Sequence, residues 1–480
     1  MPVSAGYIHA YIERNFENLN FAVLSQDEVV DLMTSTCGLM YNYIEEHILD
    51  YAYSDKFDDM FEMITELYYI QFMDFTHRDA ETNICGKREC LNSDITNILH
   101  LSYRFIRKFV VPPREYPGSF IRVEQSDRVK TRMKAKIESL KSIPQPEQRT
   151  RAWYKFRHET LTASNIWKIF GSESTQNQLI YSKCLPLEIR DSDCIDATSN
   201  ADNTHIDANT REVALEPPKR VNITTTLHWG HKYEPLSVLY YEHQYNTRVD
   251  DFGCIPHPEY SYIAASPDGI NCCPESDRFG RMLEIKNIVN RDITGHPKME
   301  YWVQMQLQME TCGLNECDFL ETRFTEYPSY AEYLEDCVPT RYINNESDVG
   351  VDKPIIRGKI LHFEKNGQPI YKYHEFGLTA AEIDAWEEKT MTENSEIMWV
   401  QTLYWKLAEV SCVLVLRNKL WFDKAQPFMY LTHKIIEEEK HGDYSHRAPK
   451  RKSATKRQKK EDSVPEQEII FGTGKCHIIV

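Results

Sequence analysis

Two apolar segments separated by an acidic turn constrain the fold of this 480-residue chain more than any other feature. The first ends in the run IAASPDG at residues 263–269, and the second, MLEIK at residues 282–286, alternates apolar and charged side chains. Successive side chains of a strand point to opposite faces, so this alternation predicts a strand with Glu284 and Lys286 on one face. If the two segments pair as a hairpin, Asp268 converges on Glu284.

The array of Asp268, Glu284 and Lys286 has the composition of a metal-dependent site that cleaves phosphodiester bonds. Two carboxylates with few other ligands nearby suit a hard cation such as Mg²⁺, which keeps several waters. The lysine can hold an attacking water or stabilise negative charge that develops on a phosphate oxygen. The spacing E-x-K also occurs on solvated strand faces, and this simpler interpretation stays open for the segment alone.

Helices are predicted before and after this array. Residues 227–234, LHWGHKYE, begin one helix and place a third carboxylate, Glu234, near its start. Residues 301–309, YWVQMQLQM, form another helix in which Gln304 and Gln308 share a face. Buried polar side chains need hydrogen-bond partners, which an active-site cleft would provide. A polar face exposed to solvent is the alternative.

A further cluster of polar side chains lies upstream, in residues 153–166, WYKFRHETLTASNI. Thr162 or Ser164 can cap the helix that is predicted to follow. Arg157 with one or both hydroxyls can instead bind a phosphate, because guanidinium groups and helix starts favour anions. These residues alone do not decide between the cap and the phosphate site.

Five motifs follow one another between Trp153 and Phe324: W-x-x-x-R-x-x-x-x-TAS, WG-x-x-YE, ASPDG, LEIK and YW-x-Q-x-Q. In this order they resemble the lambda-exonuclease family, also called YqaJ-like viral recombinase, of the PD-(D/E)XK nuclease superfamily. The resemblance leaves residues 1–145 and much of the region after residue 330 uncovered. The overall make-up is similar to the versions that large DNA viruses encode.

The resemblance implies an α/β fold of the restriction-endonuclease-like kind, a central mixed sheet flanked by helices. It implies Mg²⁺-dependent hydrolysis of double-stranded DNA from a free 5′ end, with Mn²⁺ as a substitute metal, in DNA recombination, repair or viral genome processing. A structure-specific endonuclease and a non-catalytic DNA-binding scaffold are the alternatives. The family is often built as a ring of three subunits, so the resemblance also suggests a homo-oligomer and a single-strand annealing protein as partners.

The motifs also assign roles by resemblance. Asp268, Glu284 and the main-chain carbonyl of Ile285 match the metal ligands of the family. Lys286 resembles the residue that positions the nucleophilic water, and Glu234 resembles the helix carboxylate that serves the metal or its water. The remaining matches are the glutamine that supports this centre and the residues of the 5′-phosphate pocket: Gln304, and Arg157, Thr162, Ser164 and Ser266.

Composition divides the chain into three regions. Residues 1–145 are predicted to form a helical accessory domain, because apolar residues such as Phe57, Met60 and Ile64 recur at helical spacing. Residues 146–440 are expected to hold the nuclease core, with a polar insertion at 190–225. Residues 441–480 form a basic tail that is predicted to be disordered.

The second half of the core region gives weaker secondary-structure signals. The Asn-Gly pair at 366–367 predicts a hairpin of residues 359–363 and 370–373. Residues 379–409 are predicted to form a helix capped by Thr379. Residues 413–416 and 428–431 are expected to form late strands.

The charge of the chain is unevenly distributed. The 56 Lys and Arg against 73 Asp and Glu give a net charge of −17, which argues against a simple basic coat for nucleic acid. Residues 447–460, RAPKRKSATKRQKK, carry eight basic and no acidic side chains. This run fits a nuclear-import signal or an arm that contacts phosphates, with a solvated tail as the alternative. The expected location is therefore intracellular, in the nucleus or at a viral replication site.

The apolar runs and the cysteines agree with an intracellular location. No run approaches the roughly 18 apolar residues that a membrane span needs, and no signal peptide is visible. The 13 cysteines are scattered over a long chain, which argues against a disulfide framework. Cys85 and Cys90 with His77 and His100 have a loose spacing for zinc, and ordinary reduced thiols are the favoured interpretation.

Overall fold

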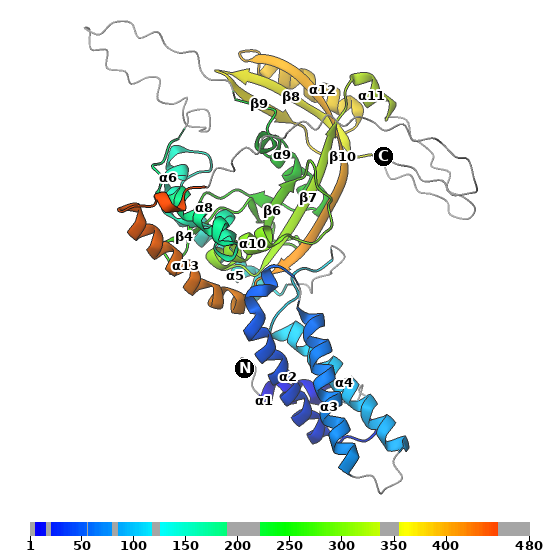
Figure 1. Cartoon of the computed structure of the whole chain (residues 1–480). Coiled ribbons are helices and arrows are strands. Elements are labelled where there is room, and N and C mark those ends of the chain that lie inside the picture. The colour runs from blue at the N-terminus through cyan, green and yellow to red at the C-terminus, as the bar shows by residue number, and fades with distance from the viewer. Residues whose placement is uncertain are drawn as a thin grey trace, which may run out of the picture.

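The computed structural model describes residues 5–15, 21–54, 56–78, 85–117, 125–189, 221–336 and 355–449. It consists of an elongated set of N-terminal helices and an α/β body built on a curled sheet (Figure 1). Within the described ranges, no helix combines the length and the apolar character that a membrane span requires. The polar insertion expected at 190–225 and the basic tail fall mostly outside the described residues.

The N-terminal part is helical, as its apolar periodicity indicates. Helix α2 begins at a capping box in which Ser25 and Glu28 bond each other's backbone N–H groups. The buried carboxylate of Asp94 in α4 accepts hydrogen bonds from the backbone N–H groups of residues 22–24 and ties the start of α2 to α4. The helices are α1 Ala5–Asn15, α2 Gln26–His47, η2 Ile48–Ala52, α3 Phe57–Arg78 and α4 Cys85–Phe109.

The body contains a mixed sheet of seven strands in the order β2-β5-β6-β7-β10-β8-β9. Strands β6 and β7 run parallel, and every other neighbouring pair in this sheet is antiparallel. This architecture confirms the expected mixed α/β class. The strands are β2 Val249–Asp250, β5 Gly269–Asn271, β6 Met282–Asn287, β7 Glu316–Glu326, β8 Arg357–Lys365, β9 Gln368–Tyr373 and β10 Met398–Leu416.

A smaller sheet and several helices surround this sheet. The small sheet has the order β1-β4-β3, with β1 parallel to β4. The body elements outside the large sheet are β1 Leu161–Thr162, β3 Ile255–Pro256, β4 Ile263–Ala265, α5 Asp127–Ser142, α6 Arg151–Glu159, α7 Ala163–Ile166, η3 Trp167–Phe170, α8 Glu173–Cys184, α9 Thr226–Tyr245, α10 Met299–Cys312, α11 Tyr330–Glu335, α12 Ala380–Glu393, α13 Lys419–Lys440 and η5 Ser445–Arg447.

Strand β6 is covered on both of its faces. Leu283 and Ile285 belong to the apolar cluster that includes Tyr240 and Tyr241 of α9. Met282 belongs instead to the main core, which includes the buried face of α10. Because side chains alternate along a strand, Glu284 points to the same side as Met282, the side of α10.

The expected helix over residues 379–409 is wrong beyond Glu393. Helix α12 starts at the predicted cap, where Thr379 forms a capping box with Glu382, but it ends at Glu393. Residues 398–416 form the 19-residue strand β10, which pairs with β8 in its first half and with β7 in its second half. Pairing with two strands that are distant in sequence overrides the local helical pattern of this segment.

The late elements also differ in part from the expectation. The hairpin of β8 and β9 is present, and Asn366 and Gly367 both have positive φ, as a two-residue type I′ turn requires. Residues 413–416 end β10, as predicted. Residues 428–431 lie instead inside helix α13, whose buried residues Trp421, Ala425 and Met429 recur every four positions.

A buried ion-pair network joins α9, β7 and the loop before β6. Asp318 of β7 is 1% exposed and accepts hydrogen bonds from the Tyr241 hydroxyl at 2.5 Å and from Arg281 Nη1 at 3.0 Å. Arg278 Nη1 donates to the same carboxylate. Because a buried charge must be paired, this network fixes the segment that leads into β6.

Replacing Asp318 with Asn removes the counter-charge of the buried Arg278 guanidinium and leaves the Arg281 guanidinium paired with Glu316 alone. We expect Asp318→Asn to lower the free energy of unfolding by about 3 kcal/mol or more, measured by urea denaturation. The control is Glu409→Gln, which breaks an exposed ion pair with Arg323 and is expected to cost less than about 1 kcal/mol. Equal stability of the two variants would contradict the role of the network.

Candidate active site

Asp268 and Glu284 are brought together by the pairing of β5 and β6. Gly269 is the register partner of Leu283, so Asp268, just before β5, lies beside Glu284. Asp268 Oδ2 accepts the backbone N–H of Ile285 at 2.7 Å. The two segments therefore converge, although the strand before the acidic turn, β4, belongs to the smaller sheet, and it is β5 that pairs with β6.

A steric constraint explains why glycine follows Asp268 in the ASPDG motif. A Cβ atom at Gly269 would lie 2.1 Å from Cγ1 of Val249 on the adjacent strand β2. A larger residue would push β5 away from β2 and move the acidic turn. The motif thus fixes the position of Asp268 through close strand packing.

The carboxylate of Glu284 is fully buried and bonded at both oxygens. Its Oε1 accepts from Gln304 Nε2 at 2.7 Å and forms an ion pair with Lys286, and its Oε2 accepts from Gln308 Nε2 at 2.8 Å. Gln304 and Gln308 are one helical turn apart on α10, so both reach the same strand residue. The polar stripe of this helix therefore faces the site rather than solvent. Gln308, which is fully buried, is a site residue that the motif match does not include.

Lys286 is held as a cation. Burial alone would lower the pKa of its ammonium group, but Glu284 and Asp268 outweigh burial and raise that pKa. Its Nζ also lies 5.2 Å from the ring centroid of Tyr301 on α10, within the range of a cation–π contact. Lys286 is therefore a positive charge next to two acids.

Glu234 reaches the site from helix α9 and forms an ion pair with Arg149. Burial raises the pKa of its carboxyl group, and the charges of Arg149 and Lys286 oppose this rise. Arg149 Nη2 lies 3.3 Å from Glu234 Oε2. The backbone of Arg149 has φ of 64°, a left-handed conformation that is costly for a residue with a side chain. The sequence gives no signal for Arg149 beyond its place after a proline-rich break.

The upstream residues form a connected group around Arg157. Arg157 Nη2 donates to Ser164 Oγ at 2.8 Å, and the hydroxyls of Ser164 and Thr162 are 3.3 Å apart. The Arg157 guanidinium lies 4.2 Å from the ring centroid of Trp153, whose Nε1 lies 3.4 Å from Ser266 Oγ. The four residues that were matched to a phosphate pocket are thus joined directly or through one tryptophan.

The capping interpretation of this group is not supported. Thr162 occupies the N-cap position of α7, but its side chain makes no capping hydrogen bond. Helix α7 has only four residues, so its dipole offers little to an anion. The hydroxyls of Thr162 and Ser164 instead face each other and Arg157.

Lys183 holds the backbone of the Arg157 group in place, and none of the five motifs includes it. Its Nζ donates to the backbone carbonyls of Arg157 at 2.5 Å and Thr160 at 2.8 Å. Burial, with a contribution from Arg157, lowers the pKa of its ammonium group to about 7. A buried lysine with carbonyl partners anchors the end of α6 and therefore the backbone of Arg157.

The acids of the site fit a divalent cation. Burial and the neighbouring Glu284 raise the pKa of the Asp268 carboxyl group well above its usual range, because negative charge accumulates where water is scarce. Mg²⁺ needs only one or two carboxylates in addition to waters. The N–H and C=O groups of a strand residue point to the same edge, so the Ile285 carbonyl faces the edge where Asp268 lies. In the described ranges, no set of three or more His, Cys, Asp or Glu side chains is arranged to hold a metal ion, so the fit rests on these groups.

The zinc ligands considered in the N-terminal helices fall partly outside the described residues. Cys90 is exposed and forms no disulfide. The side chains of His77 and Cys85 lie outside the described residues.

Comparison with known proteins identifies part of the chain. Residues 152–315, which contain the acidic array and the Arg157 group, match the YqaJ-like viral recombinase domain. An uncharacterised protein of Acanthamoeba polyphaga mimivirus is 28% identical over 347 residues, which cover 66% of this chain and 56% of that protein. The chain thus spans little more than half the length of this relative, whose source is a large DNA virus, in line with the expected resemblance.

Solved structures give a more distant likeness. The crystal structure of an alkaline exonuclease (LHK-Exo) from Laribacter hongkongensis is 16% identical, with a TM-score of 0.31, and the match covers 61% of this chain and 94% of that one. A structure of LHK-Exo in complex with dAMP matches with 16% identity, a TM-score of 0.30 and the same coverage.

The raised pKa of Asp268 leads to a stability prediction. As pH rises above about 4, the unfolded chain loses this proton before the folded chain does, so the carboxyl group destabilises the fold at neutral and higher pH. We expect Asp268→Asn in EDTA to melt about 2 °C or more above the parent chain at pH 8, and the gain to disappear near pH 4.

The matched control is Asp292→Asn at an exposed site, which should not change the melting temperature. Addition of Mg²⁺ should raise the melting temperature of the parent chain more than that of Asp268→Asn. A variant that is less stable than the parent at pH 8 would contradict the electrostatic account of the site.

Proposed function

We propose that this chain, which carries a YqaJ-like viral recombinase domain over residues 152–315, is a Mg²⁺-dependent deoxyribonuclease that degrades duplex DNA from a 5′ end. Its proposed role is in DNA recombination, repair or viral genome processing. The observation that carries the proposal is the convergence of Asp268, Glu284 and Lys286 inside the matched domain. The substrate is double-stranded DNA with a free 5′ end, and Mn²⁺ is a proposed substitute metal.

The residues that would hold the metal are Asp268, Glu284 and the Ile285 carbonyl. When bound, Mg²⁺ would polarise a phosphoryl oxygen and lower the pKa of a bound water. Gln304 and Gln308 keep Glu284 in one orientation by bonding both of its oxygens. This second layer of contacts would fix the ligand geometry as hydrogen-bonded outer residues do in other metal sites.

Two charged side chains would act on the phosphate and the water. The ammonium group of Lys286 stays protonated beside its acids and would stabilise negative charge that develops on the scissile phosphate. The carboxyl group of Glu234, whose pKa burial raises, would accept a proton from the attacking water more readily than an ordinary carboxylate.

The Arg157 group would bind a terminal 5′-phosphate. Guanidinium and hydroxyl donors close together favour a phosphate because charge-assisted hydrogen bonds are the strong ones. Ser164 and Thr162 already orient their hydroxyls towards one another beside Arg157. Burial of Arg157 against Trp153 strengthens its electrostatic effect on an anion.

Helix α5 supplies a cationic surface on an otherwise acidic protein. Its sequence, DRVKTRMKAKIESLKS, has six Lys or Arg side chains and two acidic ones. Lys141 is already paired with Asp250, and most of the other basic side chains of the helix are exposed. This exposed helix would contact backbone phosphates of DNA in a salt-dependent way.

Nuclear import through the basic run at 447–460 stays a proposal. Arg447, the first residue of this run, forms an ion pair with Glu439.

The alternatives differ in the substrate that is cleaved. A structure-specific endonuclease would also cut closed circles, whereas a non-catalytic scaffold with a nuclease-like fold would cut nothing. Incubation of the purified chain with linear, nicked and closed circular duplex, in Mg²⁺ and in EDTA, separates the three. Mononucleotides released from linear duplex in Mg²⁺ alone are the expected result.

Removal of either catalytic charge should abolish cleavage, and Asp268→Ala does so while it leaves the ion pair of Glu284 with Lys286 in place. Lys286→Ala and Asp268→Ala are each expected to lower the rate of nucleotide release at least about 100-fold, because each removes charge stabilisation at the phosphate or a metal ligand. Lys389→Ala and Asp292→Ala, which alter exposed charges, serve as controls. A folded Lys286→Ala protein with full activity would disprove the assignment.

The phosphate pocket predicts a preference among DNA ends. The parent chain should degrade duplex with a 5′-phosphate faster than duplex with a 5′-hydroxyl, and Arg157→Ala should lose about 10-fold in rate on the phosphorylated end only. Lys155→Ala changes an exposed cation on the same helix and should keep the preference. Arg157→Lys keeps the charge but loses the planar fork, so it should restore part of the rate. Equal rates of the parent chain on both ends would remove the claim.

A further inference from the structure

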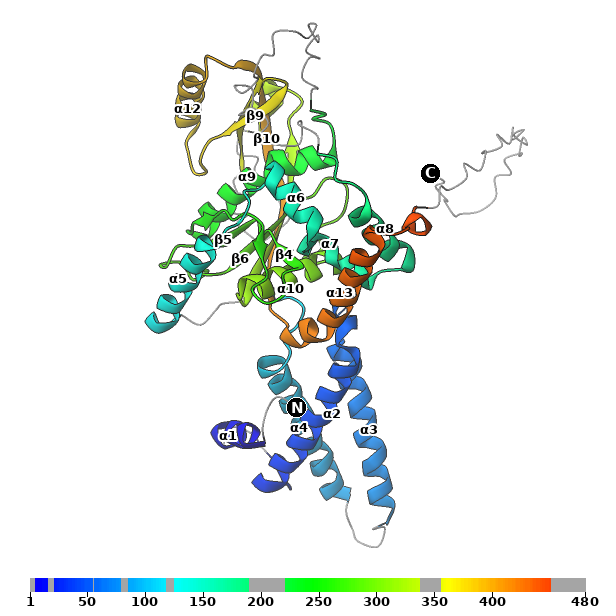
Figure 2. The ribbon, with the colours of Figure 1, turned by 90° about the vertical axis from the view of Figure 1, so that its left-hand side faces the viewer.

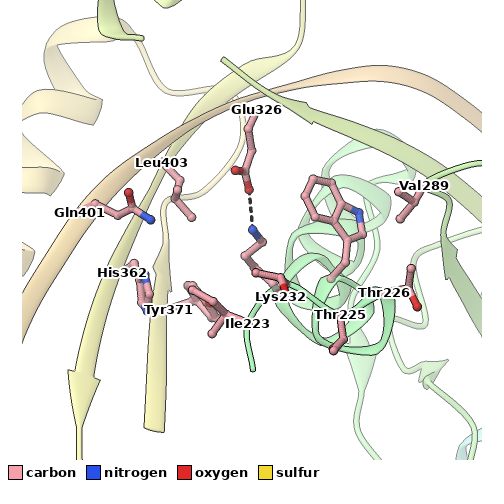
Figure 3. A pocket seen from close by; sticks show the side chains of 12 residues that line it. Ile223, Thr225, Thr226, Lys232, Val289, Glu326, His362, Tyr371, Gln401 and Leu403 are labelled. Carbon is pink, nitrogen blue, oxygen red and sulfur yellow. Dashed lines mark hydrogen bonds and ion pairs between the residues drawn. The ribbon is translucent and has the colours of Figure 1, made fainter. Parts of the chain in front are cut away.

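A cavity of about 290 Å³ is lined in part by helix α9, which also carries Glu234 of the candidate active site. It is bounded by the start of α9 on one side and by side chains of β7, β8, β9 and β10 on the other (Figure 3). Its volume is close to the lower end of the roughly 300–1,000 Å³ of typical ligand pockets. Because β8 to β10 lie outside residues 152–315, much of its lining is not part of the matched domain.

Aromatic rings form fixed walls of this cavity. The Tyr371 hydroxyl and Nε2 of His228 are 2.7 Å apart, and the ring of Tyr371 packs on that of His362 with centroids 4.8 Å apart. On the α9 side, the Trp229 ring packs on Tyr233 with centroids 4.5 Å apart. Rings held in place in this way offer flat apolar surfaces for another planar group.

The cavity carries no net charge. The ammonium group of Lys232 forms an ion pair with Glu326 at 2.5 Å, so each compensates the other. Burial and the adjacent Lys232 lower the pKa of His362, which keeps its imidazole neutral at pH 7. A phosphate would need a cation that is not already paired, so the lining suits an uncharged planar ligand.

Two polar atoms of the lining lack a hydrogen-bond partner within the described residues. They are Nδ1 of His362, a side chain that is only 4% exposed, and Nε1 of Trp229. Both atoms are closed off from solvent, so a ligand in the cavity does not reach them, and its contacts are with the rings themselves.

The cavity and the candidate active site share helix α9, on which residues two positions apart point to different sides. Lys232 in the cavity and Glu234 in the site are two residues apart on α9. Val289, which also lines the cavity, follows Lys286 by three residues along the chain. Figure 3 shows the paired Lys232 and Glu326 between Tyr371 and Val289.

We propose that this cavity binds one unpaired nucleobase, stacked on its aromatic walls. A nucleobase is flat and uncharged and carries both donors and acceptors on its edge. A base inside a duplex has both faces covered by its neighbours, so only an unpaired base can enter. The assignment of this base to a DNA strand next to the catalytic centre rests on the proposed nuclease function.

The direct test is photocrosslinking of the full chain in EDTA, so that no DNA is cleaved. The probe is a duplex with a single-stranded extension, in which 5-iodouracil replaces one extension base at a time. We expect a crosslinked peptide that contains Trp229 or Tyr371. The same base placed within a blunt duplex should give no such peptide.

Binding measurements provide the second test. Tyr371→Leu and Trp229→Leu should each weaken affinity for the extended duplex about 5-fold or more in fluorescence anisotropy, with little change for the blunt duplex. Tyr430→Leu removes an exposed aromatic ring of α13 and is the matched control. The crosslink with the unaltered chain remains decisive if a variant does not fold.

The outcomes separate the two proposals and the two sources of the base. Crosslinks confined to other peptides would overturn the nucleobase site, even if the chain cleaves DNA. A crosslink at Tyr371 in a chain that cleaves no DNA would overturn the nuclease but keep the site. Competition by equimolar dTMP would identify a released nucleotide as the occupant, and its failure to compete would identify the strand.

Discussion

The buried carboxylate of Glu284 is the interaction on which the candidate site depends. Its charge is balanced by Lys286 on the same strand face, and both of its oxygens are bonded by glutamines of α10. A buried carboxylate without these partners would destabilise the fold by several kcal/mol. The position of α10 against β6 is therefore tied to the geometry of the acidic array, so that the packing of the helix and the arrangement of the site constrain each other.

Strand β10 joins β8 and β9 to the rest of the large sheet. It pairs with β7, which lies next to β6, and its other half pairs with β8. This pairing curls the sheet and brings β8, β9 and α12 to the end of the molecule opposite the N-terminal helices (Figure 2). Helix α9 carries both Glu234 at the candidate site and Lys232 at the cavity. A single helix thus connects the acidic array to a neutral aromatic pocket.

Much of the candidate site follows from local periodicity. A period of two places Glu284 and Lys286 on one face, and a helical period places Gln304 and Gln308 one turn apart. Such relations hold whenever the segment forms the expected element. Prediction of β10 fails for the converse reason, because a helical pattern over residues 394–409 competes with pairing to strands that lie far away in the chain.

Contacts between distant segments were beyond the reach of the sequence pattern. Arg149 reaches Glu234 across 85 residues of sequence, from a backbone conformation that its residue type disfavours. Lys183 binds carbonyls 26 and 23 residues earlier in the chain, although nothing in its neighbourhood marks it as buried. Neither contact has a spacing rule, because both depend on how whole elements pack.

The sequence by itself determined the acidic array and the supporting glutamine face, which depend on side-chain chemistry and on the fixed periods of strand and helix over a few residues. The mixed α/β class followed instead from the resemblance of the ordered motifs to a known family. Only the tertiary structure decided the partners of Glu234 and Arg157 and the aromatic cavity beside them. These depend on the curl of the sheet around β10, and strand pairing over long sequence distances is set by the packing of the whole body rather than by any local pattern.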